Sequence, residues 1–216
     1  MARLKVAVLI SGRGSNLQSL IDACAAKDFP AEIALVISNR AAAQGLARAS
    51  HAGIATATID HKAVADRAAF DAALDRAIRA SGAGLVCLAG FMRLLTPGFV
   101  AAWRDRMINI HPSLLPAFPG LHTHERALAA GCRFAGCTVH FVRAETDTGP
   151  IIAQAAVPIR TDDNATSLAA RVLEAEHRIY PLALRWVAEG RVRVVGERAA
   201  VAGAEAPDGA MINPAG

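Results

Sequence analysis

The sequence predicts a single α/β domain. We expect a mostly parallel, doubly wound (Rossmann-like) sheet in the first half, an added antiparallel pair of strands in the second, and helices on both faces. Three observations favour this fold. Short apolar runs alternate with amphipathic segments as far as residue 90, as in successive β-α-β units. Two later strand-like segments face each other across a turn. The 216 residues contain no repeat and no linker, which fits one domain over residues 1–198 and a flexible Ala/Gly/Pro-rich tail over 199–216.

Hydrophobic periodicity places the elements of the first half. Val6–Ile10 is a short apolar run bounded by glycine, as expected of a buried parallel strand. Phe70, Leu74 and Ile78 recur on one face of a helix. The strands of this half are predicted at Val6–Ile10, Ile33–Ile37, Ala55–Ile59 and Leu85–Ala89, and the helices at Ser15–Ala26, Ala41–His51 and Val64–Ser81.

The pattern changes after residue 90. A brief strand leads into a Pro-rich loop, and an antiparallel pair follows around a turn at 146–150. A capping region at Thr161–Asn164 precedes a long closing helix. The strands of this half are predicted at Met107–Ile110, Ala135–Val142, Ile151–Val157 and, as a last edge strand, Arg191–Val195, and the helix at Ser167–Glu189.

Composition and charge limit the partners. The chain is 53% hydrophobic, and 49 of its residues are alanine, so the sequence is that of a globular protein with a core. Its 23 basic and 19 acidic residues give a formal charge of +4. Residues 1–100 carry 11 basic and 7 acidic side chains, and residues 101–216 carry 12 of each, with no basic block. This favours a small phosphorylated ligand over nucleic acid.

Two further features concern location and metal. The apolar run after Lys5 has five residues, too few for a signal-peptide core or a membrane span, so we expect a soluble cytoplasmic protein. The spacing of Cys132, Cys137 and His140 does not match a zinc site. We therefore expect no metal and no membrane contact. The cysteines expected to be structural thiols are Cys24, Cys87, Cys132 and Cys137.

The first strand ends in a glycine loop, Ile10–Asn16 (ISGRGSN), at the start of the first helix. Free backbone N–H groups and the helix dipole favour an anion at such a position. The loop lacks the third glycine of a dinucleotide-binding fingerprint, where Leu17 stands, and the lysine of a Walker loop. It predicts a phosphate site for something other than NAD or ATP. The alternative is a tight turn in which Ser15 or Asn16 only caps the helix.

Three polar residues point to chemistry in the second half. Asn109 and His111 alternate with apolar residues at the end of a strand and share one face. Asp147, in the turn of the antiparallel pair, is in a position to reach back to them. Asp would orient the imidazole, while His and Asn would stabilise an oxyanion and move a proton in transfer at a carbonyl. No nucleophile elbow is present, which favours direct attack by a substrate amine. The alternative is that Asn and His satisfy only the loop backbone.

Several motifs resemble those of folate-dependent formyltransferases, in particular members that act on glycinamide ribonucleotide. The likeness runs from about Leu4 to Arg193 and implies transfer of a formyl group from 10-formyltetrahydrofolate to the glycinamide amine, a step of purine synthesis. The motifs that carry it are Asn109–Pro116 (NIHPSLLP), Ile10–Asn16, Leu88–Leu95 (LAGFMRLL), Gly120–His124 (GLHTH), Gly136–Phe141 (GCTVHF) and Asp147–Pro150 (DTGP).

The resemblance assigns roles to individual positions. It makes Asn109, His111 and Asp147 the catalytic residues, with His111 as general acid. It places the phosphate on Gly14, Ser15 and Asn16, and the ribose hydroxyls on Glu176. The folate pocket would be formed by Arg67, Met92, Arg93, Leu94, Leu95 and Asn109 together with Arg143, Ala144, Glu145, Thr146 and Asp147, and the catalytic residues would be supported by His122, His124 and His140.

Two other functions remain open at this point. A formyltetrahydrofolate hydrolase would share the Asn-x-His motif, although such relatives carry an extra domain. A phosphate- or nucleotide-binding relative would keep the fold without the chemistry. The sequence is compatible with a monomer or a homodimer.

Overall fold

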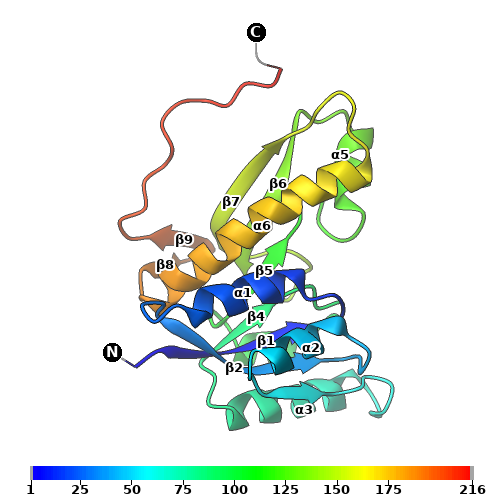
Figure 1. Cartoon of the computed structure of the whole chain (residues 1–216), viewed down its shortest axis with the longest axis vertical. Coiled ribbons are helices and arrows are strands. Elements are labelled where there is room, and N and C mark those ends of the chain that lie inside the picture. Colours follow the sequence, from blue (N-terminus) through cyan, green and yellow to red (C-terminus); the bar gives the residue numbers. More distant parts are fainter. Residues whose placement is uncertain (1, 215–216) are drawn as a thin grey trace.

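The computed structural model describes residues 2–214 and contains, within them, nine strands and six helices (Figure 1). The strands are β1 (Leu4–Ile10), β2 (Ala31–Ser38), β3 (Thr56–Thr58), β4 (Leu85–Leu88), β5 (Met107–His111), β6 (Phe134–Phe141), β7 (Ile151–Pro158), β8 (Val192–Val195) and β9 (Arg198–Val201). The helices are α1 (Ser15–Ala25), α2 (Gln44–His51), α3 (Arg67–Ala80), α4 (Pro97–Ala102), α5 (Thr123–Ala129) and α6 (Ala165–Ala188).

Seven strands form one sheet in the order β3-β2-β1-β4-β5-β6-β7. The first five strands in this order are parallel, and β6 and β7 each run antiparallel to the preceding strand. This confirms the predicted parallel half and the added antiparallel pair. The chain reverses its direction of winding between β1 and β4, and ligands of such sheets bind beyond the carboxyl ends of the strands at that point.

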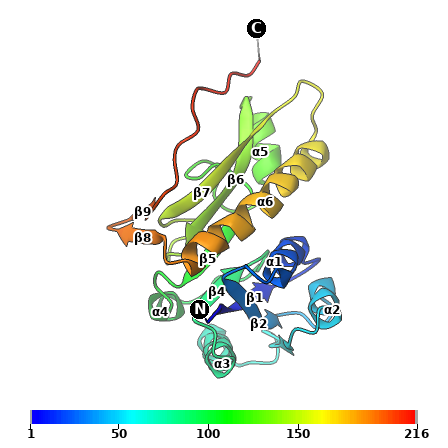
Figure 2. The ribbon, with the colours of Figure 1, turned by 60° about the vertical axis from the view of Figure 1, so that its left-hand side comes forward.

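Helices cover both faces of the sheet (Figure 2). Alternate residues of β1 enter two separate cores: Val8 belongs to the core beneath α1 and α6, and Leu9 to the core beneath α3 and α4. Both side chains are fully buried. The prediction of a doubly wound domain is therefore confirmed by its packing.

The long closing helix begins where the sequence predicts a cap. Asn164 Oδ1 accepts hydrogen bonds from the backbone N–H groups of Thr166 and Ser167, and the Ser167 hydroxyl accepts from the Asn164 N–H. This reciprocal pairing satisfies N–H groups that a helix start leaves free. None of the helices within residues 2–214 is long and apolar enough to cross a membrane.

Three elements differ from the expectation. Helices α4 and α5 were not predicted, because six or seven residues show too little periodicity. Strand β8 is present but pairs with β9 in a separate two-stranded sheet and does not lie at an edge of the main sheet. Residues 199–201, expected in the tail, belong to β9, because pairing with β8 supplies backbone hydrogen bonds that the local sequence does not reveal.

Candidate active site

The three predicted catalytic residues come together at the end of β5. Asn109 and His111 lie on one side of the strand, and the side chain of His111 is buried. His111 Nδ1 lies 3.4 Å from Asp147 Oδ2, and Nε2 lies 3.0 Å from the carbonyl oxygen of Phe118. The backbone N–H of Gly120 donates to the same Asp147 oxygen over 2.7 Å. Both ring nitrogens of His111 thus face hydrogen-bond acceptors.

His140 holds the amide of Asn109 from the neighbouring strand. Asn109 Nδ2 lies 3.2 Å from His140 Nε2, and His140 Nδ1 lies near the carbonyl oxygens of Phe141 and Thr148. Burial lowers the pKa of His140, so the ring stays neutral. A neutral ring that donates from Nδ1 accepts at Nε2, which fixes one amide hydrogen of Asn109 and leaves its second N–H free to serve the site.

The other two histidines differ from His140. Burial lowers the pKa of His124, and its Nδ1 has no hydrogen-bond partner among residues 2–214. His122 precedes α5 with a φ of 57°, and its side chain is 74% exposed and 3.6 Å from Glu125. The structure therefore brings His140 into contact with Asn109, whereas His122 lies at the surface.

The glycine loop is shaped by contact between two glycines. Gly14 caps α1 with a φ of 73°, a left-handed conformation that favours glycine. A Cβ on Gly14 would lie 2.7 Å from Gly45 Cα, so the loop touches the backbone of α2. The N–H of Gly45 also donates to Gly12 O over 3.1 Å. Because Gly14 offers no side-chain cap, Ser15 and Asn16 lie in an uncapped first turn, as an anion site requires.

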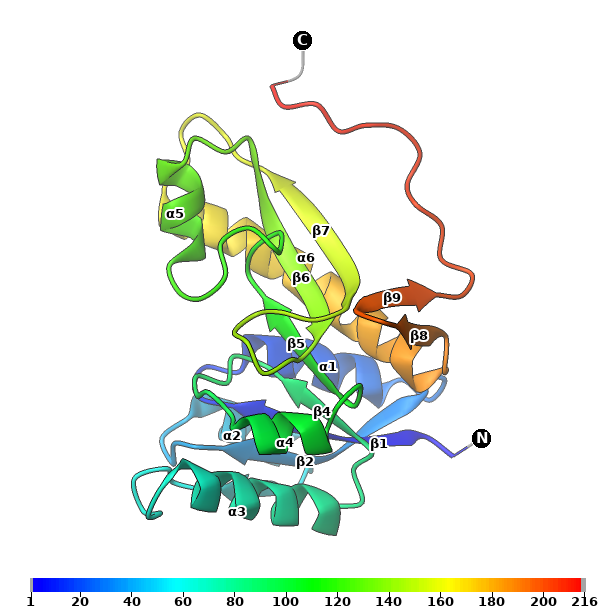
Figure 3. The ribbon, with the colours of Figure 1, turned by 180° about the vertical axis from the view of Figure 1, so that it is seen from behind.

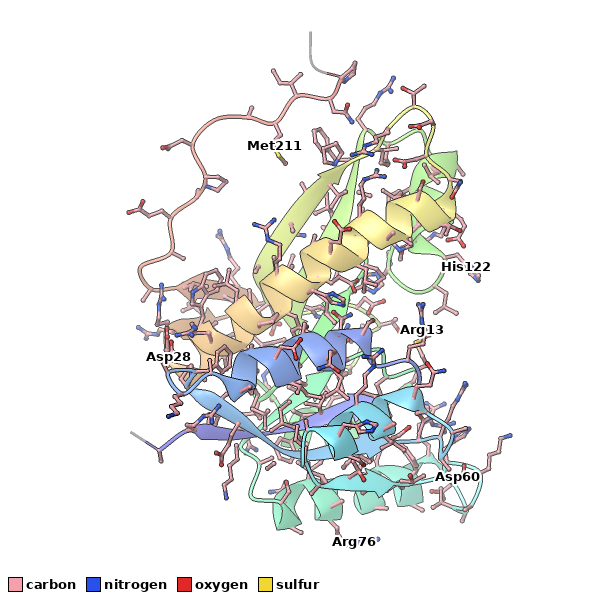
Figure 4. The ribbon with its side chains drawn as sticks, viewed as in Figure 1. Arg13, Asp28, Asp60, Arg76, His122 and Met211 are labelled. Carbon is pink, nitrogen blue, oxygen red and sulfur yellow. The ribbon has the colours of Figure 1, made fainter. Side chains whose placement is uncertain are left out.

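The loops that surround the site share one edge of the molecule. Figure 4 shows Arg13, Asp60 and His122 from three different loops along the same side. Asp28, in the loop between α1 and β2, lies at the opposite side. The glycine loop follows β1, and His111 ends β5. Because β1, β4 and β5 are parallel, both lie at the carboxyl edge of the parallel strands, which is the expected ligand position for this sheet.

Glu176 of α6 reaches the glycine loop through Asn16. Asn16 Nδ2 donates to Glu176 Oε2 over 2.7 Å, and the glutamate is 6% exposed. Burial raises the pKa of Glu176, while the hydrogen bond from Asn16 acts in the opposite direction. A buried carboxylate with one oxygen engaged keeps acceptor capacity for a hydroxyl donor.

The segment after β4 is held at both ends by buried side chains. The N–H of Met92 donates to Ser11 Oγ over 2.8 Å, and the Ser11 hydroxyl donates to Asn39 Oδ1 over 2.6 Å. At the other end, the N–H of Thr96 donates to Asp71 Oδ2 over 2.6 Å. The backbone of 92–96 is therefore prearranged, and Ser11 connects it to the glycine loop.

The side chains of this segment form an apolar surface. Met92 and Leu94 are 58% and 60% exposed, and Leu95 packs against the core beneath α3 and α4. The Arg93 guanidinium lies over the ring of Phe70, 5.2 Å from its centroid. Exposed apolar side chains on a fixed backbone suit a flat ring ligand.

The remaining residues predicted to bind folate differ in their exposure to solvent. Arg67 begins α3 and is exposed, and so are residues 144–146. Arg143 is different, because its side chain is 8% exposed and its guanidinium donates to Asp105 and Glu197 over 2.8 and 2.7 Å. The backbone of Arg143 belongs to the loop between β6 and β7, but its guanidinium points toward these two carboxylates.

The three buried thiols, Cys24, Cys87 and Cys137, offer no nucleophile to the site. All four cysteines are free, and burial raises the pKa of Cys24 to about 11 and of Cys137 to about 12. Such thiols stay protonated near neutral pH. Within residues 2–214 there is no group of three or more His, Cys, Asp or Glu side chains arranged to hold a metal ion.

Four residues of the site escaped the sequence reasoning. Ser11 and Asn39 follow buried strands, where a polar residue signals a shared hydrogen bond. Asp71 interrupts the apolar face of α3, and Gly45 lies in a helix, where glycine is unfavourable without a packing reason. Each is a local exception to a pattern, and each has a partner far away in the sequence.

An amide, an imidazole and a carboxylate that meet at the end of a sheet are suited to an enzyme that transfers a group at a carbonyl. The model of the formyl transferase family matches residues 4–184. The chain therefore belongs to the formyl transferase family, an enzyme family, as the motifs predict.

Within that family the similarity is to phosphoribosylglycinamide formyltransferases. The chain is 48% identical to that enzyme of Escherichia coli strain K12 over 191 residues, 88% of this chain and 90% of the relative. It is 51% identical to the trifunctional purine biosynthetic protein adenosine-3 of Gallus gallus over 192 residues, 89% of this chain but 19% of that much longer protein. The crystal structure of glycinamide ribonucleotide transformylase 1 from Symbiobacterium toebii superposes with a TM-score of 0.90 at 50% identity, covering 92% of this chain and 94% of that one.

Proposed function

We propose that this chain transfers a formyl group from 10-formyltetrahydrofolate to the amine of glycinamide ribonucleotide, a step of purine synthesis. The observation that carries the proposal is the meeting of Asn109, His111 and Asp147 at the end of β5. The similarity to formyltransferases of this specificity supports it.

The donor and acceptor would bind at adjoining parts of the candidate site. The phosphate of the ribonucleotide would lie on the first turn of α1, at Gly14, Ser15 and Asn16. Glu176 would accept hydrogen bonds from the ribose hydroxyls. The pterin would pack on the apolar surface after β4, lined by Met92, Arg93, Leu94 and Leu95, with Arg67 and the backbone of the 143–147 loop at its border.

The reaction follows from the groups at the end of β5. The amine nitrogen forms a bond to the formyl carbon, and the carbonyl electron pair moves to oxygen. The free N–H of Asn109 would stabilise that oxyanion together with the Nε2–H of His111, which would exchange the carbonyl oxygen of Phe118 for the oxyanion as its acceptor. The intermediate collapses by breaking the bond to folate N10, which takes a proton from His111, while the attacking amine loses one proton to solvent.

Asp147 has a separate role in this scheme. Its carboxylate lies against Nδ1 of His111 and is itself fixed by the N–H of Gly120. It would keep the imidazole aligned for the transfer. The amine attacks directly because the buried thiols and the absence of a nucleophile elbow in the sequence offer no acyl-enzyme route.

The proposal is tested by supplying 10-formyltetrahydrofolate with and without glycinamide ribonucleotide and following loss of the formyl group. We expect rapid deformylation only with the amine substrate, and formylated ribonucleotide as the product. Equal deformylation without the amine would identify a hydrolase instead. Binding of both ligands without turnover would identify a binding protein. The Asn109→Ala protein, checked for folding, controls for uncatalysed loss.

A further inference from the structure

The side chain of Arg143 is a buried cation that joins three separate parts of the chain. Its Nε donates to Glu197 Oε2 over 2.7 Å, and its Nη2 donates to Asp105 Oδ1 over 2.8 Å. Glu197 lies in the turn between β8 and β9, and Asp105 precedes β5. The other oxygen of Glu197 accepts from Arg104 over 2.7 Å. Breaking a pair that contains a buried charge is costly, because it leaves that charge unpaired.

Arg143 also contacts both ends of the loop that carries Asp147. It is the second residue after β6, and its aliphatic stem lies against Gly149, where an added Cβ would be 2.9 Å from Arg143 Cγ. Gly149 has a φ of 121° and lies close to the carbonyl oxygen of Phe141. The stem of Arg143 therefore packs across the base of the loop, while its guanidinium is bound by carboxylates that lie outside the loop.

Asp147 depends on such support. Its φ of 52° is in the left-handed region, which is uncommon for a residue with a side chain. Backbone conformations of this kind persist only where surrounding contacts determine them. The described contacts of its carboxylate are those with Gly120 and His111. A loop that shifts at its base would move this carboxylate away from the imidazole.

The hairpin formed by β8 and β9 lies beyond the part of the chain that the family model matches, which ends at residue 184. Figure 3 shows β9 beside the beginning of β7, where the loop after β6 returns to the sheet, and Figure 1 agrees. The hairpin is thus placed to contact that loop through the ion pair between Glu197 and Arg143.

We propose that Arg143 is a positioning residue and that the β8–β9 hairpin, through Glu197, together with Asp105, holds it so that Asp147 stays aligned with His111. The proposal deepens the proposed formyl transfer and rests on it for its effect on activity. The alignment of Asp147 with His111 would then depend on the β8–β9 hairpin, which lies outside the residues that the family model matches.

The test is the double variant Asp105→Asn/Glu197→Gln, which removes both carboxylates. Asparagine tolerates the left-handed conformation of residue 105, whose φ is 54°, so the backbone is preserved. We expect kcat to fall several-fold, KM for 10-formyltetrahydrofolate to rise, and the pH profile of kcat to move in the direction produced by Asp147→Asn. Arg143→Lys keeps the charge without the planar fork and should give an intermediate effect.

Glu189→Gln is the matched control. It removes a carboxylate that pairs with Arg185 and Arg191 at the base of the same hairpin and does not contact Arg143. It should leave the pH profile unchanged. If the double variant does not fold, Glu197→Gln alone is compared with this control by the same measurements.

Amide hydrogen exchange over residues 144–149 provides a readout that needs no activity. We expect exchange there to be at least several-fold faster in the double variant than in Glu189→Gln. Exchange and pH profile equal to those of the control would overturn the proposal. A wild-type protein without formyl transfer would refute the proposed function alone, because exchange would still decide whether Glu197 and Asp105 hold the loop.

Discussion

Two loops contribute to the candidate site, and they are built in opposite ways. The glycine loop after β1 obtains its shape from backbone, since Gly14 packs against Gly45 and no larger side chain fits between them. The loop after β6 is held by charged and polar side chains from β5 and the β8–β9 turn and by a backbone N–H of the segment before α5. Adding atoms to the glycines should therefore disturb the conformation of the first loop. Removing charges or hydrogen bonds should disturb the conformation of the second.

The largest effect is expected in the part that depends on side chains. Asn109→Ala removes an N–H donor to the oxyanion and leaves His140 Nε2 without its partner. We expect kcat to fall by about 10²-fold, the scale of losing one oxyanion-hole donor. Asn213→Ala, which changes the same residue type in the C-terminal tail, serves as control in a steady-state assay. Similar turnover in both folded proteins would contradict the role of Asn109.

Asp147→Asn should have a smaller effect that depends on pH. The amide keeps the shape and can still accept the Gly120 N–H, but it carries no negative charge beside His111. The pH profile of kcat should therefore change, because the variant lacks the carboxylate that contacts the imidazole. The profile is measured from pH 5 to 9 at saturating substrates. An unchanged profile would remove Asp147 from the mechanism.

Gly45→Ala tests the loop built from backbone. The new Cβ would lie 2.5 Å from Ile10 Cδ1 and 3.2 Å from Gly14 Cα, so the buried Ile10 side chain must move and the glycine loop must give by a few tenths of an ångström. We expect a loss of about 1–3 kcal/mol in the free energy of unfolding, typical of overpacking. KM for glycinamide ribonucleotide should rise several-fold, with kcat nearly kept.

Gly98→Ala is the control for this change, because a Cβ there meets nothing within 4 Å. It lies in α4 and should stabilise the protein by about 0.5–1 kcal/mol through helix propensity. Urea unfolding of both variants measures the difference. Equal stability would mean that the glycine contact does not shape the loop.

The smallest effect is expected from Glu176→Gln. Burial raises the pKa of Glu176 in the folded state above its ordinary 4.5. The stability that this group contributes is therefore fully present below pH 4.5 and is lost as pH rises through the raised value. The Gln variant does not ionise, so it does not lose stability in this way and should be more stable than the wild-type protein at pH 7.5. It should bind glycinamide ribonucleotide more weakly. Unfolding curves at pH 5 and 7.5 measure the difference, and a variant less stable at both would contradict it.

The contrast between local and distant contacts also explains which features could be predicted from the sequence. The parallel half follows from apolar runs and helical periodicity, because each element there is determined by neighbours in the chain. The glycine loop was recognisable for the same reason, since its glycines are consecutive features of one turn. Asn109 and His111 were visible because polar residues interrupt an apolar strand.

What could not be predicted depends on distant partners. Gly45 matters only because α2 packs on the loop, and Ser11 only because Met92 lies beside it. The place of Asp147 was suggested by its turn, but its support by Arg143 requires Glu197, fifty-four residues further on. The strand β9 escaped for the same reason, because its pairing with β8 leaves little trace in an Ala-rich segment.

The most direct measurement of the central claim is the single-turnover rate of formyl transfer by His111→Ala with both substrates bound. Single turnover separates the chemical step from binding and product release. The account predicts a rate at least ~10²-fold below that of the wild-type protein, with nearly unchanged affinity for both ligands. A folded His111→Ala protein that transfers the formyl group at close to the wild-type rate would contradict it.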